Sequence, residues 1–179
     1  MVNFNGCLKM GESTVNDLKL TEKGTAENIL DADSGITYKY IKDICNECFG
    51  EKYKAYQRGH YNINDYYIAW FPKMAIEENG RKKPGSKTKN WINILDDNGN
   101  TIIEYNYDEP ADVSKKLENM IRLVFGKSKG EDYRFLGIFK TVFSGDSDAG
   151  YARYIHKRVA SRIDITKLNK DMYCNYMQK

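Results

Sequence analysis

The sequence predicts an α+β fold in which a bent antiparallel sheet, or a small β-barrel, carries helices on its outer side. Strand-like segments outnumber helical ones, and no parallel βαβ repeat is present. Of the 179 residues, 41% are hydrophobic and 30% are charged, which is typical of one globular domain. The 14 Tyr, 7 Phe and 2 Trp suit a thick β core or a surface on which rings stack. We therefore expect a single domain over residues 1–179, with an irregular arm at 1–33 and an α/β body at 34–179.

The first helix is expected after Ser34, where apolar residues recur at helical spacing as far as Phe49 and Gly50 provides the stop. Its apolar stripe includes Cys45 and Cys48, which form a C-x-x-C. A closed zinc site needs two further ligands close by. The other candidates are scattered along the chain: Cys7, His60, His156 and Cys174. We therefore expect buried free thiols, no metal ion, no cofactor and a reducing, cytoplasmic compartment.

The middle and end of the chain contain mainly strands and loops. Residues 65–72 predict a strand, and the stretch 73–90 predicts a long loop. A second helix is expected over 110–126, because apolar side chains recur there at helical spacing. Two further strands are expected at 132–143 and 151–159, followed by a tail without a firm pattern.

The clearest hairpin is built around Asn98-Gly99, the strongest signal for a two-residue type I′ turn. This turn fixes the register of the strands 89–97 and 100–107. The expected pairs are Trp91–Asn106, Ile92–Tyr105, Asn93–Glu104, Ile94–Ile103 and Leu95–Ile102.

The register divides the hairpin into two faces. Ile92, Ile94 and Ile103 form an apolar face that we expect to lie in the core. The opposite face holds Trp91, Asn93, Glu104 and Asn106. A large ring beside a carboxylate and two amides suits a planar, hydrogen-bonding ligand, while the alternative is a solvated sheet face with one aromatic side chain.

Positive charge is concentrated in two places, although the net charge is only +3. Residues 80–90 carry five cations and no acid, and they end beside Trp91. A second group lies in the strand 151–159. The candidate phosphate contacts are Arg81, Lys82, Lys83, Lys87, Lys89, Arg153, Lys157 and Arg158. Cations beside a stacking ring are typical of nucleic-acid binding, while a solvated Lys-rich loop is the alternative.

Signatures of catalysis are scarce. The sequence holds no Walker loop, no G-x-G-x-x-G and no H-E-x-x-H motif. His156 is expected in mid-strand, in a structural or phosphate-contacting role. A metal-dependent nuclease would need Asp96, Glu104 and His60 as its site residues. Asp96, however, lies in the hairpin turn, where Asp is a common residue for structural reasons. We therefore expect a binding protein with no catalytic residues rather than an enzyme.

Three strings in the C-terminal half resemble the closing strands of PUA-like modules: YRFLGIFK at 133–140, YIHKRV at 154–159 and ID at 163–164. This superfamily holds the SRA, EVE, YTH and ASCH domains, some of them fused to bacterial modification-dependent restriction enzymes. The resemblance implies a bent β-barrel with flanking helices. It also implies binding of DNA or RNA, often with a modified base in an aromatic pocket.

Two hypotheses follow for the function. In the leading one, a nucleic-acid-binding module of PUA-like architecture stacks an extruded base on Trp91 with Trp70 or Tyr67, while Glu104 and Asn93 read its edge. In the second, a small phage or mobile-element protein inhibits a nuclease or another nucleic-acid-processing defence enzyme by protein contact. No apolar run approaches the ~20 residues of a bilayer span, so no membrane partner is expected.

Overall fold

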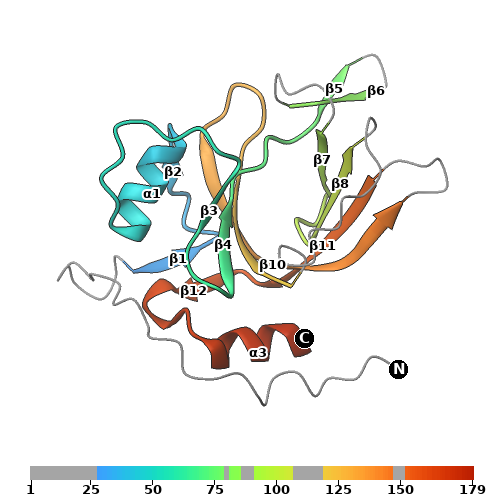
Figure 1. Ribbon diagram of the computed structural model, residues 1–179. Coiled ribbons are helices and arrows are strands. Elements are labelled where there is room, and N and C mark those ends of the chain that lie inside the picture. Colours follow the sequence, from blue (N-terminus) through green and yellow to red (C-terminus); the bar gives the residue numbers. More distant parts are fainter. Residues whose placement is uncertain (1–27, 79–80, 86–90, 107–118, 147–151) are drawn as a thin grey trace.

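The computed structural model describes residues 28–78, 81–85, 91–106, 119–146 and 152–179 (Figure 1). Its main feature is an eight-stranded sheet that is antiparallel except where β4 pairs with β9. Seven strands run in the order β3-β4-β9-β10-β11-β8-β7, and β2 pairs with one end of β10. The strands are β2 (Thr37–Tyr38), β3 (His60–Asn62), β4 (Tyr67–Trp70), β7 (Trp91–Leu95), β8 (Thr101–Asn106), β9 (Ile121–Gly126), β10 (Tyr133–Asp146) and β11 (Ala152–Ala160).

Two small sheets and the helices complete the described part of the chain. β1 (Ile29–Asp31) pairs with β12 (Arg162–Asp164), and β5 (Ile76–Glu78) pairs with β6 (Arg81–Lys83). The helices are α1 (Ile41–Phe49), the short 3-10 helix η2 (Ile165–Lys167) and α3 (Lys170–Gln178). Figure 1 shows both α helices outside the curve of the large sheet. None of the described helices has the length and apolar character needed to cross a membrane.

The large sheet bends along β10 and β11, its two longest strands (Figure 1). β10 shifts register twice against β11 and once against β9. Bulges of this kind bend a strand and increase its twist. The predicted α+β fold, with a bent sheet and flanking helices, is confirmed.

The segment after β4 ties together two strands that are distant in the sheet. The Met74 N–H donates to the Lys127 carbonyl beyond β9 at 2.9 Å, and the Ala75 N–H donates to the Asn93 carbonyl of β7 at 2.7 Å. Isolated bridges join Lys73 to Lys127 and Met74 to Asn93. One segment therefore spans from β9 to β7 without completing a regular barrel.

The bend gives the sheet an outer, convex face and an inner, concave face. On the outer face, Tyr67, Leu123 and Phe125 are fully buried in a core that also includes residues of α1, β2 and α3. On the inner face, residues of β8, β9 and β10 meet across the curve. This second cluster consists of Met74, Ile102, Val124, Leu136 and Phe139, with Trp70 and Leu95 packed against it.

The apolar stripe of α1 lies in the outer core, as predicted. Cys45 is fully buried, Cys48 is half-buried, and both are free thiols. Burial raises the pKa of Cys45 to about 12 and that of Cys48 to about 11. Both side chains therefore stay protonated near neutral pH, which makes them poor nucleophiles.

The register predicted for the β7–β8 hairpin is confirmed in all five pairs. The turn itself differs from the expected two-residue loop. It closes where the Gly99 N–H donates to the Asp96 carbonyl at 2.9 Å, with Gly99 at φ +67°. The Asp96 carboxylate accepts the N–H groups of Asn100 and Thr101 at 2.6 and 3.0 Å, so it stabilises the turn.

The predicted facing of this hairpin is only partly right. Ile102, on the face assigned to solvent, is fully buried on the inner face of the bend. Of the three residues assigned to the core, Ile92 is buried, whereas Ile94 and Ile103 are only half-buried. The reason is the curvature of the whole sheet, which the pattern of one hairpin does not reveal.

The helix predicted at 110–126 is also wrong in its second half. Residues 121–126 form β9, and all six are buried; residues 107–118 lie outside the described residues. In a short run that is apolar on both faces, the spacing of apolar residues does not distinguish a helix from a central strand. β9 lies between β4 and β10, where such a run belongs.

Smaller differences concern element ends. The predicted loop 73–90 contains the β5–β6 pair, and the arm 1–33 contributes β1. The tail holds β12, η2 and α3. The first helix begins at Ile41, because Thr37 and Tyr38 pair with β10 instead.

The two isoleucines of the hairpin provide a test of its facing. Ile102→Ala should lower the free energy of unfolding by about 2–5 kcal/mol, because it truncates a fully buried side chain. Ile94→Ala removes the same atoms from a half-buried side chain, so it should cost clearly less. Urea denaturation of both variants measures the difference, and an equal or larger loss for Ile94→Ala would contradict the inner-face assignment.

Candidate nucleic-acid interface

Two aromatic contacts lie on the inner face. The Trp70 ring of β4 lies 4.9 Å from the His156 ring of β11, centroid to centroid. The Trp91 ring of β7 lies 6.1 Å from the Tyr154 ring of β11, with 33° between their planes. Trp70, Trp91 and Tyr154 are all partly exposed, so part of each ring is accessible to a ligand.

Between these contacts runs a chain of polar side chains from four strands. Arg122 Nη1 of β9 donates to the Met120 carbonyl at 3.0 Å and to Thr141 Oγ1 of β10 at 2.6 Å. Thr141 Oγ1 lies 3.1 Å from His156 Nδ1. On the other side of the ring, His156 Nε2 lies 3.4 Å from Glu104 Oε2 of β8.

His156 is the most deeply buried member of this chain, with 1% of its surface exposed. Burial lowers the pKa of His156; the nearby Glu104 carboxylate opposes this shift, and the Arg122 charge adds to it. The ring is therefore neutral at physiological pH. His156 has the structural role that the sequence allowed.

Asn93 lies directly opposite Glu104 in the β7–β8 pair. Its side chain is 8% exposed, and its amide nitrogen donates to the Lys73 carbonyl at 3.3 Å. Its Oδ1 atom is buried without a hydrogen-bond partner. An unpaired buried acceptor costs about 1–3 kcal/mol, so this oxygen is a candidate to accept a hydrogen bond from a ligand.

The structure brings four of the five predicted pocket residues to the inner face: Trp70, Trp91, Asn93 and Glu104. Tyr67 is the exception, and its predicted stacking role is wrong. Its ring is fully buried in the outer core, and its hydroxyl donates to the Asn169 carbonyl at 3.2 Å. Residues 67 and 70 are three apart on one strand, so alternation directs them to opposite faces.

The predicted phosphate contacts do not gather on one face. On β11, Arg158 lies on the same side as His156, whereas Arg153 and Lys157 alternate to the outer face. The Arg153 guanidinium lies 5.9 Å from both the Tyr105 and the Phe143 rings. Arg81, Lys82 and Lys83 form β6, with the Lys83 side chain exposed, and Lys87 and Lys89 lie outside the described residues.

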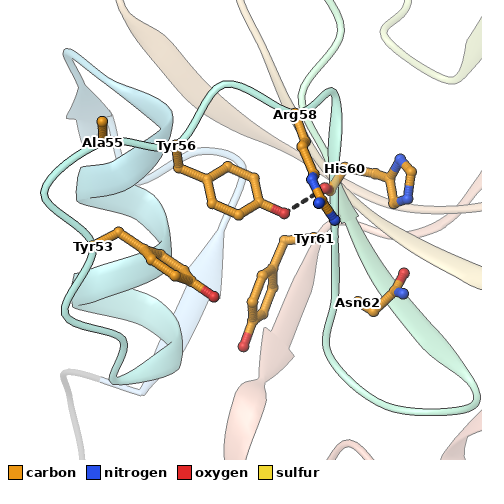
Figure 2. Close-up of a pocket in the computed structure, with 7 residues that line it drawn as sticks. All are labelled: Tyr53, Ala55, Tyr56, Arg58, His60, Tyr61 and Asn62. Carbon is orange, nitrogen blue, oxygen red and sulfur yellow. Dashed lines mark hydrogen bonds between the residues drawn. The ribbon is translucent and has the colours of Figure 1, made fainter.

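A polar pocket lies between α1 and the edge strand β3 (Figure 2). It is lined by Tyr53, Ala55, Tyr56, Arg58, His60, Tyr61 and Asn62. The Tyr56 hydroxyl donates to the His60 carbonyl at 2.8 Å, and the Tyr61 hydroxyl donates to Glu51 at 2.6 Å. Figure 2 shows the His60 side chain directed away from these tyrosines, so the pocket does not place the imidazole among them.

The nuclease hypothesis gains no support from the described residues. Asp96, Glu104 and His60 do not form a cluster of three side chains that could hold a metal ion. The Asp96 carboxylate already accepts two backbone N–H groups of its own turn.

Sequence reasoning missed three contributors to the inner face: Arg122, Thr141 and Tyr154. Arg122 was hidden inside a wrongly predicted helix, and a bulge separates Thr141 from the simple alternation of β10. Tyr154 carried a usable signal, because it precedes His156 by two residues and therefore shares its face.

The lowered pKa of His156 predicts how stability depends on pH. The unfolded chain binds a proton at the ordinary His pKa of 6.5, but the folded protein does so only at lower pH. The free energy of unfolding should therefore fall as pH decreases below 6.5, by up to about 1.4 kcal/mol per pH unit for this one proton. Denaturation between pH 7.5 and 5.5 measures this slope. His60→Gln should keep the slope and His156→Gln should flatten it; equal slopes in both variants would assign the effect elsewhere.

Comparison with known proteins identifies a family. The model of the SET and RING associated (SRA) domain matches residues 24–165, whereas no curated protein matches the chain. The match extends from before β1 through β12 and η2's first residue, so the relationship is not confined to the C-terminal half, as the three strings alone implied. The chain therefore belongs to the SRA family of the PUA-like superfamily.

Proposed function

We propose that this SRA domain binds DNA and holds one extruded base against the inner face of its sheet. Family membership supports nucleic-acid binding and the reading of a modified base. One observation supports this location for the base. Asn93, Glu104 and Tyr154 are register neighbours on three adjacent strands, and the Trp91 ring lies 6.1 Å from Tyr154.

In this proposal, each group has a distinct task. Trp91 and Tyr154 offer ring faces for stacking, with Trp70 as a third ring further along the inner face. Glu104 and Asn93 offer oxygen acceptors to the edge of the base. Extruding a base costs a few kcal/mol, and stacking contributes about 1–3 kcal/mol per base, so a ring contact with two hydrogen bonds offsets the cost.

The five cations of residues 80–90 are the proposed phosphate contacts, with Arg153, Lys157 and Arg158 as further candidates. The Ala75 N–H bonds to the Asn93 carbonyl, so the β5–β6 pair that follows starts beside β7. This connection supports a role for Arg81, Lys82 and Lys83 near the inner face. Phosphate contacts fix the position of a nucleic acid but carry no sequence information.

The proposal is tested by titrating the protein with matched modified and unmodified DNA and RNA oligonucleotides over a salt series. Binding that falls with salt and prefers one base or modification supports both the phosphate contacts and the pocket. A steep salt dependence without base preference would remove the pocket. Absence of binding at low salt would overturn the proposal and favour the protein-inhibitor hypothesis, which no described contact otherwise favours.

Tryptophan substitutions test the stacking role. Trp91→Ala should weaken DNA binding by about 1–3 kcal/mol, the contribution of one base–aromatic stack. Tyr67→Phe is the control, because it removes one hydroxyl from the outer core and should leave affinity unchanged. Fluorescence anisotropy with a labelled duplex measures both, and equal affinities for wild type and Trp91→Ala would contradict the stacking role.

The lysines of residues 80–90 are tested separately, by the salt dependence of binding. Replacing Lys82, Lys83 and Lys87 with Ala should weaken binding equally for all sequences and lower the salt slope by up to about three, because each lost phosphate contact removes ~0.9 on a duplex. Stability should change little, as surface substitutions usually stay within roughly ±0.5 kcal/mol. An unchanged slope would mean that these lysines make no phosphate contacts.

A further inference from the structure

We infer that Arg122, Thr141 and His156 form a one-way hydrogen-bond relay that fixes Glu104 as an acceptor, so that the inner face selects a nucleobase edge with an exocyclic amino group. The identity of the ligand rests on the proposed function. The relay itself belongs to the free protein and can be tested without nucleic acid.

The direction of the relay starts at Arg122, whose guanidinium has donors and no acceptor. It is 8% exposed and donates to Thr141 Oγ1 at 2.6 Å. Thr141 Oγ1 therefore accepts from Arg122, and its own hydrogen is available for a different acceptor. The neighbour within reach is His156 Nδ1, at 3.1 Å.

The next step follows from the ring. If Nδ1 accepts from Thr141, the single proton of the neutral imidazole must be on Nε2. That N–H then points to Glu104 Oε2 at 3.4 Å. The reverse tautomer would set the Nε2 lone pair against a carboxylate oxygen beside a ring that is 1% exposed, where no solvent relieves the repulsion.

The relay ends at a carboxylate that is free to act further. The Glu104 side chain is 19% exposed, so its remaining acceptor sites are accessible. Asn93, directly opposite, adds a buried Oδ1 without a partner. Two adjacent acceptors favour an edge with an exocyclic amino group and its two N–H donors, as in cytosine, adenine and guanine. Thymine is disfavoured, because its single N3–H lies between two carbonyl acceptors. His156, Thr141 and Arg122 thus act as positioning residues for Glu104.

Nitrogen NMR tests the relay directly. The chain has only two histidines, so two-bond ¹H–¹⁵N spectra of wild type and His60→Gln assign the His156 ring. In the free protein at pH 7, we expect a protonated Nε2 and an unprotonated Nδ1. Thr141→Val removes the hydroxyl that donates to Nδ1 but leaves Glu104 beside Nε2, so it should keep the tautomer and shift the Nδ1 resonance. An unchanged Nδ1 resonance would contradict the Thr141 step. A protonated Nδ1 in wild type would overturn the relay.

Binding tests the selection. Duplexes that differ only in one central mismatched base, adenine, cytosine or thymine, are compared with wild type, Thr141→Val, Glu104→Gln and Val142→Thr. Wild type should prefer the amino-bearing bases about tenfold, the usual size of one base-edge contact. Thr141→Val and Glu104→Gln should lose most of this preference while general affinity persists. The control Val142→Thr changes an exposed neighbour and should keep it.

The outcomes separate the two proposals. The expected tautomer without any DNA binding by wild type would retain the relay and overturn the proposed function. DNA binding without base preference in wild type, or a preference retained in Thr141→Val, would overturn the selection.

Discussion

The bend of β10 is the constraint on which the rest of the structure depends, and Gly137 lies at the first of the register shifts in this strand. Its φ of +120° is outside the range that L side chains readily adopt. A Cβ at this position would lie 2.7 Å from Arg158 Cδ and 2.8 Å from the Ala160 carbonyl oxygen. β10 can therefore turn across β11 only because residue 137 has no side chain. Both the inner cluster and the polar chain use residues of β10 beyond this position, Phe139 and Thr141.

Local patterns predicted local features well. The Asn98-Gly99 signal gave the correct register of β7 and β8, because a tight turn leaves few alternatives for the pairs beside it. The stripe of α1 correctly predicted a buried Cys45. Trp91, Asn93 and Glu104 were grouped correctly for the same reason as the register, since cross-strand neighbours follow from it.

Features that depend on distant parts of the chain were not predictable in this way. The facing of the hairpin depends on the curvature of β10, which lies beyond it in the sequence. The chain from Arg122 to Glu104 joins four strands, and no sequence spacing brings them together. The sequence of β9 does not identify it as a strand, because burial on both faces removes the alternation by which a strand is recognised. Tyr67 is a different case. Strand alternation alone places it and Trp70 on opposite faces, so its position was predictable from the sequence.

The inner face also gives the protein an optical property. Its only two tryptophans, Trp70 and Trp91, both lie on this face, while many of the 14 tyrosines surround the outer core. Emission excited in the indole band therefore originates entirely from the concave side of the sheet. Indole emission responds to stacked rings and to the polarity around it, so any molecule that enters the curve is reported by the unlabelled protein, and events on the convex side leave the signal largely unchanged.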